Sequence, residues 1–142
     1  LWYFFHIFSE QINDKFFIAK RNEILSLLSD ICNNLPCPTC SEHARAYLKK
    51  YRFHRIETKE QLKLFFYNFH NSVNQRTKKE HFPYNQMELY KKGKILKILD
   101  FVYVELSKPV HNDNFTLSFF KKNAVKNLRA FISKYQIFFT TF

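Results

Sequence analysis

Two cysteines separated by two residues are the strongest candidates for chemistry in this chain. Cys37 and Cys40 stand in the stretch "LPCPTCSEH", and Pro38 directly follows the first of them. Because proline is favoured at the first position of a helix, we expect Cys37 at or near the N-cap and Cys40 in the first turn. There the helix dipole stabilises a thiolate, and the spacing allows a small, reducible disulfide. The pair is therefore a candidate redox centre.

Other interpretations of the cysteines remain open. Cys37, Cys40 and His43 could bind zinc with His70 as a fourth ligand, but no second C-x-x-C and no H-x3-H accompanies them, so this indication is weak. A thioredoxin fold would need βαβ units around the pair, and its flanks have helical patterns on both sides. The two cysteines could also be incidental.

A second group of residues could bind a ligand. His70 and Asn74 are four apart and so share one face of a helix, with Phe66 and Val73 close to it. Polar groups on a Phe-rich face need partners once they are buried. A flat heteroaromatic ligand would offer stacking and hydrogen bonds together, whereas backbone groups could satisfy the same pair without a ligand.

The composition excludes several classes of site. The 142 residues suit one domain, and they contain a single glycine. Glycine-rich phosphate loops and dinucleotide-binding fingerprints need several glycines, so neither can be built here. Hairpin-rich sheets also commonly need glycine, which favours helices. The sequence therefore predicts an all-α protein.

The net charge of +11 has two interpretations. One is a lysine-rich solvated surface, and the other is an acidic partner such as nucleic acid, a membrane surface or an acidic protein. No apolar run approaches the roughly 20 residues that cross a bilayer, and no secretory signal is visible. The chain begins at Leu1 rather than Met, so we expect a trimmed fragment that could lack a targeting segment.

Hydrophobic periodicity predicts the helices that position these residues. Pro36 ends one helix, and Thr58 with Gln61 forms a capping box that begins another. Inward positions of the helix after Pro38 and of the helix after Thr58 are expected at Ala44, Tyr47, Leu48, Tyr51, Leu62, Phe65, Phe66, Phe69 and Val73. The expected helical ranges are 1–12, 16–35, 38–51, 58 to beyond 73, 84–106 (with Leu89, Ile95, Leu99 and Val102 inward) and 116–134. Pro109 and "HNDN" at 111–114 break the chain, and the β-prone "YQIFFTTF" at 135–142 stays unassigned.

Three motifs in this order resemble the Erv/ALR family of FAD-dependent sulfhydryl oxidases. That family has W-x3-H, then C-x-x-C at a helix start, then H-N-x-V-N with a lysine just after. Here the motifs are Trp2/His6, Cys37/Cys40, and His70-Asn71-Ser72-Val73-Asn74 followed by Lys79. The resemblance runs from Leu1 to about Tyr90, and "CPTCSEHA" and "FHNSVNQRTKK" look closest to the short enzymes of large DNA viruses.

The resemblance implies a four-helix bundle around FAD with a short fifth helix, usually as a homodimer. Residues 1–90 would form the FAD-binding bundle. Residues 91–142 would be a helical C-terminal extension, either packed on the same domain or offering a basic docking surface.

The resemblance also implies the site. Cys37 and Cys40 would be catalytic, Lys79 with Lys78 would meet the phosphates, and Phe66 and Phe82 would pack against a ring. The implied cofactor-binding residues are Trp2, His6, Cys40, His43, Phe66, His70, Asn71, Val73, Asn74, Lys78, Lys79 and Phe82.

The implied reaction forms disulfides in protein dithiols. A dithiol of a thioredoxin-like or viral protein would attack Cys37, the outer sulfur, and Cys40 would leave as a thiolate. Cys40 would lie against the isoalloxazine and pass electrons to FAD, and dioxygen would reoxidise the flavin to give hydrogen peroxide. Nucleic acid is not expected as a partner.

The sequence departs from the family pattern at several positions. Gln11 stands near the slot of a common tyrosine, and Thr77 replaces a common leucine. The second, structural disulfide of the family cannot form because only Cys32 remains, which we expect to be a buried thiol. There is no shuttle C-x-x-C, so electrons must come from an external dithiol, a partner protein or a missing segment.

Two other functions and the compartment stay open. One is a non-enzymatic basic helical module that binds nucleic acid or a protein partner, and the other is a degenerate oxidase fold kept as a structural protein. A viral protein would suit the host cytoplasm, nucleus or virion, and a cellular one the mitochondrial intermembrane space.

Overall fold

The structure is a computed structural model that describes residues 1–108 and 115–139. Its α-helices are α1 (Trp2–Gln11), α2 (Asp14–Ala19), α3 (Arg21–Asn33), α4 (Pro38–Lys50), α5 (Lys59–Arg76), α6 (Ile95–Ser107) and α7 (Phe115–Lys134). Short 3-10 segments are η1 (Phe53–Arg55), η2 (Tyr84–Lys92) and η3 (Gln136–Phe138). Within the described residues the only β pairing is a single antiparallel bridge. The prediction of an all-α protein is confirmed.

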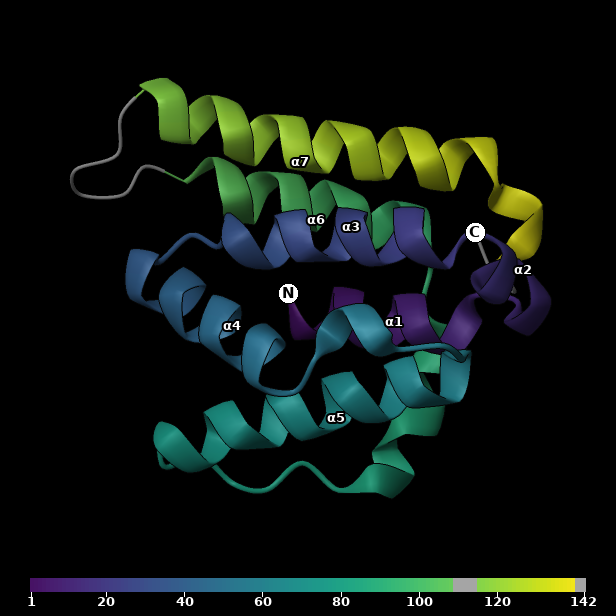
Figure 1. Cartoon of the computed structure of the whole chain (residues 1–142), viewed down its shortest axis with the longest axis horizontal. Coiled ribbons are helices and arrows are strands. Elements are labelled where there is room, and N and C mark those ends of the chain that lie inside the picture. Colours follow the sequence, from purple (N-terminus) through teal and green to yellow (C-terminus); the bar gives the residue numbers. More distant parts are fainter. Residues whose placement is uncertain (109–114, 140–142) are drawn as a thin grey trace.

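The helices form three layers (Figure 1). Helices α6 and α7 lie side by side along one face, with α7 on α3 and α6 on α1. On the other side of this middle layer, α4 packs against α3 and α5 packs against α1. Helices α1 and α3 are therefore shared between a bundle with α4 and α5, which contains the cysteine pair, and a bundle with α6 and α7.

Aromatic and aliphatic side chains fill both bundles. Phe8 of α1, Leu28 of α3 and Phe66 of α5 are each at most 1% exposed. Burying a side chain of this size stabilises the fold by about 1.5–3 kcal/mol before entropy is counted. Helix α6 presents a stripe at helical spacing to the core, formed by Ile95, Leu99, Val102 and Leu106.

The predicted helix at 16–35 is wrong in its extent, since the structure forms two helices there. Asn13 caps α2 by accepting the Phe16 N–H at 2.9 Å, and α2 ends at Ala19, because the φ of −111° at Lys20 is not helical. Helix α3 follows at once and ends at Asn33. A one-residue break leaves the spacing of buried side chains nearly unchanged, so hydrophobic periodicity does not detect it.

The predicted helix at 84–106 is also wrong, because η2 and α6 are separated at Gly93. A Cβ atom at Gly93 would lie 2.5 Å from Ile7 Cδ1, so the backbone approaches α1 closely here. The Gln11 side-chain amide donates to the carbonyl oxygens of Tyr90, Lys91 and Gly93. These contacts hold the segment apart from α6 as a 3-10 helix rather than an α-helix, and Leu89, predicted inward, is 64% exposed.

Helices predicted at 1–12, 38–51, from Thr58 onward and at 116–134 are confirmed. Thr58 Oγ1 accepts the Gln61 N–H at 3.1 Å, while Gln61 Oε1 accepts the N–H of Glu57 rather than that of Thr58. Tyr51 was predicted inward but is 51% exposed, because the chain leaves α4 there.

The C-terminal segment returns to the N-terminal helices. After η3, Phe139 pairs with Ile12, and the Asn13 N–H donates to the Phe138 carbonyl at 2.7 Å. The predicted break at Pro109 and 111–114, and the last three residues of the unassigned stretch, lie outside the described residues. No helix in 1–108 or 115–139 is long and apolar enough to cross a membrane.

Candidate functional site

The cysteine pair lies at the N-terminus of α4, as predicted. Cys37 is the N-cap, Pro38 occupies the first turn, and Cys37 Sγ accepts the Cys40 N–H at 3.3 Å. Ser41 Oγ accepts the Leu35 N–H at 2.9 Å and thereby fastens the approach to the helix. Both thiols are exposed, and no disulfide joins them in this structure.

The two thiols differ in acidity. Hydrogen bonds from the Cys40 thiol, and then from the Cys40 N–H, lower the pKa of Cys37. Burial raises the pKa of Cys40, and the neighbouring Cys37 raises it further, while Arg76 acts in the opposite direction. Cys37 is thus the thiol that ionises first, and it is also the better placed of the two to meet a solvent-borne partner.

An apolar cavity of about 190 Å³ lies beside Cys40. Four helices contribute to it: Trp2 comes from α1, Cys32 from α3, Cys40 from α4 and Val73 from α5. Cys32 is fully buried, as predicted, and burial raises its pKa to about 12. The remaining lining residues are Leu1, Phe5, Leu35, Pro36, His43, Ala44, Phe69 and Arg76.

Aromatic rings next to this cavity stack in parallel. The Trp2 ring lies 4.5 Å from the His70 ring at an interplanar angle of 10°, and His70 stacks on Phe82 at 4.9 Å and 25°. His6 is fully buried, and its Nε2 is 2.9 Å from His70 Nδ1, so one nitrogen donates to the other. The other ring nitrogen of His6, Nδ1, is buried without a hydrogen-bond partner.

The histidine pair predicts a loss of stability in mild acid. Burial, then the charge of His70, lowers the pKa of His6 to about 3, and burial, then Lys79, lowers that of His70 to about 4. Below the ordinary value of about 6.5, the unfolded chain binds protons that the folded chain does not. Between pH 6.5 and 5, His6 should therefore reduce the free energy of unfolding by up to about 2 kcal/mol, and half-buried His70 by less.

Urea unfolding at pH 7 and pH 5 would measure this effect. His6→Leu should remove most of the difference between the two pH values. Equal unfolding midpoints for the unmodified protein at pH 7 and pH 5 would contradict the prediction.

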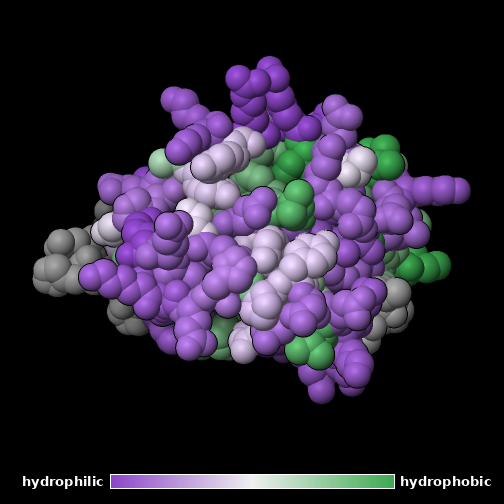
Figure 2. Space-filling model, turned by 90° about the horizontal axis from the view of Figure 1, so that it is seen from below, coloured by the Kyte–Doolittle hydropathy of each residue, from purple (hydrophilic) through white to green (hydrophobic). Residues whose placement is uncertain are grey.

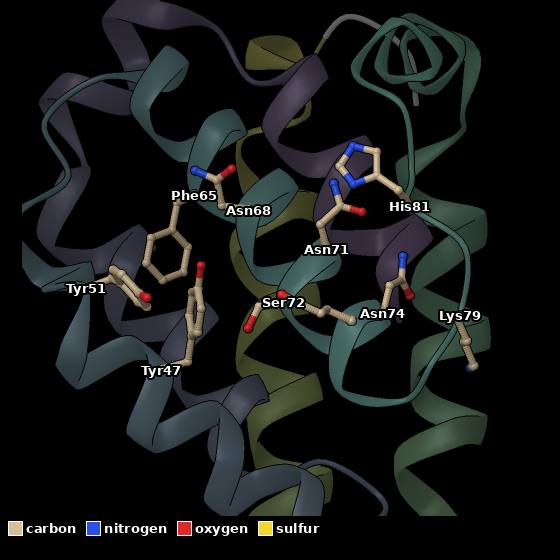
Figure 3. Close-up of a pocket in the computed structure, with 10 residues that line it drawn as sticks. Tyr47, Tyr51, Phe65, Asn68, Asn71, Ser72, Asn74, Lys79 and His81 are labelled. Atoms are coloured by element: carbon tan, nitrogen blue, oxygen red, sulfur yellow. The ribbon is translucent and has the colours of Figure 1, made fainter.

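Three residues of the predicted H-N-x-V-N motif, Asn71, Ser72 and Asn74, face a different hollow, while Val73 lines the cavity beside Cys40. Asn71 donates to the Phe82 carbonyl at 3.0 Å and accepts the Phe82 N–H at 2.7 Å, so it fastens the segment after α5. Asn71, buried Asn74 and Lys79 line a groove of about 650 Å³ across the outer side of α5 (Figure 3). Asn71 therefore orients Phe82 through its backbone.

The structure gathers most of the predicted site residues and separates two. Phe66 lies in the core, stacked on Phe5 at 4.6 Å, and lines neither the cavity nor the groove, because its face of α5 turns toward α1. Lys78 is exposed in the turn after α5, with a left-handed φ of 58°. His43 does line the cavity with Cys40.

Two residues near the site were missed in the sequence. Tyr90 lies 4.9 Å from the His6 ring, and no periodicity marks the 3-10 segment that carries it. Arg76 lines the cavity beside Cys40, and its spacing of three and seven from Val73 and Phe69 was a usable signal.

In the described residues, no group of three or more His, Cys, Asp or Glu side chains is placed to hold a metal ion.

Several known proteins are similar to this chain. The 096R protein of Invertebrate iridescent virus 3, for which FAD-linked sulfhydryl oxidase activity is proposed, is 34% identical over 79 residues. That match covers 55% of this chain and 53% of the relative, so the chain spans about half of that protein. FAD-linked sulfhydryl oxidases of two African swine fever virus isolates, Pig/Kenya/KEN-50/1950 and Warthog/Namibia/Wart80/1980, are each 24% identical over 100 residues. These matches cover 70% of this chain and 83% of each relative.

A search of solved structures gave no match. The family model of the Erv1 / Alr family matches residues 1–92, which include the stacked rings of Trp2, His70 and Phe82, the cysteine pair and the groove. The chain belongs to the Erv1 / Alr family.

Proposed function

We propose that this protein is an FAD-dependent thiol oxidase that forms disulfides in protein dithiols. The observation that carries the proposal is the cysteine pair at the start of α4, with Cys37 exposed and Cys40 lining an apolar cavity. Dithiol and dioxygen are its substrates, and disulfide and hydrogen peroxide its products. The viral relatives named as FAD-linked sulfhydryl oxidases support the same activity.

Two observations support a fit between FAD and the residues around the cavity. Parallel rings of Trp2, His70 and Phe82 offer stacking surfaces to a flat heteroaromatic group, and the buried His6 Nδ1 lacks a hydrogen-bond partner. The cavity of about 190 Å³ is smaller than the roughly 300–1,000 Å³ of typical ligand pockets. Trp2 lines the cavity and also stacks on His70. A movement of the Trp2 ring would therefore connect the cavity beside Cys40 with the stacked rings around His70.

We assign the cofactor-binding roles on the same basis. Trp2, His6, His70 and Phe82 would contact ring systems, while His43, Val73 and Cys40 would border the flavin at the cavity. Lys79 and Lys78 would offer positive charge to the phosphates, and Asn71 and Asn74 would hold the surrounding backbone. When bound, FAD supplies the two-electron acceptor that dioxygen reoxidises.

The chain's own thiols divide the work of disulfide exchange. A substrate thiolate attacks Cys37 Sγ of the oxidised pair, the Cys37–Cys40 bond breaks, and Cys40 leaves with its electron pair as a thiolate. A second substrate thiolate then attacks the sulfur that is bonded to Cys37, which releases Cys37 as a thiolate. The lowered pKa of Cys37 makes it a good leaving group in this second step.

We propose residues 1–90 as the FAD-binding bundle and residues 91–142 as an extension that supports it. Helices α6 and α7 cover one side of α1 and α3. A homodimer, which the family resemblance implies, would therefore have to use another face. The partner that supplies the dithiol would be a thioredoxin-like or viral protein.

A visible absorption spectrum of the purified protein tests the proposal. We expect a yellow protein with oxidised-flavin absorption that bleaches when dithiothreitol is added and recovers under air with release of hydrogen peroxide. A colourless protein that FAD does not reconstitute would overturn the proposal and favour a non-enzymatic basic helical module.

A further inference from the structure

One side chain at the cavity beside Cys40 has no role in the exchange steps of the two thiols. Arg76 is the last residue of α5, a helix that lies along a largely hydrophilic face of the molecule (Figure 2). Arg76 is exposed, and it also lines the cavity together with Cys40. The two residues belong to different helices, so the fold brings them to the same cavity.

Arg76 brings a permanent positive charge to a site that is otherwise largely apolar. A guanidinium keeps its charge throughout the physiological pH range. The other ionisable side chains described at the cavity are Cys32, Cys40 and His43, and the rest are apolar or aromatic. A charge next to apolar groups acts more strongly on its neighbours than the same charge in water.

No carboxylate neutralises this charge within residues 1–108 and 115–139. The ion pairs described there belong to Lys63, Lys108 and Arg129, and none of them includes Arg76. The Arg76 guanidinium is therefore available to a negative charge that forms at the cavity.

The exchange reaction produces such a charge at Cys40. When the Cys37–Cys40 bond breaks, Cys40 must hold the electron pair as a thiolate. Burial opposes this, since it raises the pKa of Cys40, and the neighbouring Cys37 raises that pKa further. The positive charge of Arg76 lowers the pKa of Cys40, and a thiol with a lower pKa is a better leaving group.

We propose that Arg76 is a positioning residue for the oxidase reaction, which acts through Cys40 by stabilising the thiolate that leaves when a substrate attacks Cys37. The inference rests on the proposed oxidase function and deepens it. In this step the substrate sulfur bonds to Cys37 Sγ, the electron pair of the broken disulfide moves to Cys40 Sγ, and Arg76 keeps its proton.

Alkylation of Cys40 tests the effect of Arg76 without any turnover. In a Cys37→Ser background, the rate of alkylation by iodoacetamide would be measured across a range of pH, with tandem mass spectrometry to separate Cys40 from Cys32. Arg76→Gln should move the rate profile to higher pH and slow alkylation near pH 7 by on the order of threefold, because less thiolate is present. Arg76→Lys keeps the charge and should restore most of the rate.

Arg45→Gln is the matched control. It removes the same charge from α4 at a position only five residues after Cys40, but Arg45 does not line the cavity. Both arginines are exposed, so neither substitution should disturb the fold, which helical circular dichroism would confirm. Arg45→Gln should leave the alkylation profile of Cys40 unchanged.

Peroxide release with dithiothreitol, expressed per bound flavin, gives the second measurement. With both cysteines of the pair present, Arg76→Gln should lower turnover by on the order of threefold, because the leaving thiolate is less stable. Arg45→Gln should turn over like the unmodified protein.

Three results would overturn the role of Arg76. These are an unchanged alkylation profile in Arg76→Gln, an equal change in Arg45→Gln, and unchanged turnover in Arg76→Gln. Absence of dithiothreitol turnover in the unmodified protein would instead refute the oxidase function, while alkylation would still decide whether Arg76 sets the acidity of Cys40.

Discussion

Replacing Cys40 by serine is expected to reduce dithiol turnover by on the order of 10³-fold or more. Of the two cysteines of the pair, Cys40 is the one that lines the cavity, so without it the Cys37–Cys40 disulfide cannot form and electrons have no route inward. Cys37→Ser should have an equally large effect, because it removes the exposed sulfur that a substrate attacks. Peroxide release with dithiothreitol as substrate measures both variants.

Cys32→Ala is the matched control because it also removes one thiol from the same cavity. Burial raises the pKa of Cys32 to about 12, so this thiol stays protonated and is not expected to take part in exchange. Turnover should remain near that of the unmodified protein. Sustained turnover in Cys40→Ser, or loss of turnover in Cys32→Ala, would contradict the assignment of Cys37 and Cys40 as the redox pair.

Leu128→Ala in α7 is expected to destabilise the whole protein by about 3 kcal/mol. Leu128 is fully buried where α7 packs on α3 and α6, and truncating a buried leucine costs about 2–5 kcal/mol. Helix α3 also contributes Cys32 to the cavity beside Cys40. Loss of flavin absorption and loss of helical circular dichroism should therefore occur in one urea transition, shifted to lower urea in the variant.

Leu89→Ala provides the control, since the same substitution at a residue that is 64% exposed should change stability by less than about 0.5 kcal/mol. Two separate transitions, with flavin release unaffected by Leu128→Ala, would show that residues 91–142 fold as an independent unit. That outcome would refute their supporting role.

Local sequence signals were sufficient for the cysteine pair. Pro36, which ends the preceding helix, and Pro38, directly after Cys37, predict a helix start, and an N-cap is determined within four residues of chain. Cys32 could likewise be placed inside from its spacing to Ile31 and Leu35 on α3, although Leu35 itself lies beyond the helix end.

Features that depend on contacts between distant segments could not be predicted. The break at Gly93 is held by Gln11 and by close approach to Ile7, more than 80 residues away along the chain. Hydrophobic spacing in 84–106 matches one helix, because Leu89 and Ile95 fit its period whether or not the chain turns between them. Periodicity records the period of apolar positions and carries no information about such a turn.

The contact that Asn71 makes with a distant segment could not be predicted from the sequence either. The motif places it beside His70, yet the structure engages it with the Phe82 backbone 11 residues later. Phe66 belongs to the same helix and was expected at a ligand, but its ring packs on Phe5 of α1. The face of α5 that meets each neighbour is set by how α1, α4 and α5 pack together.

The sequence by itself determined the all-α class, the helix start that presents Cys37 and Cys40, and the three motifs that identify the family. These properties depend on residue type, capping and spacing within one or two helical turns. Only the tertiary structure decided that four helices enclose the cavity beside Cys40, that His6 meets His70, and that a separate groove lies across the outer side of α5. Each of these requires side chains from distant helices to pack together, and packing is a property of the assembled core rather than of any local segment.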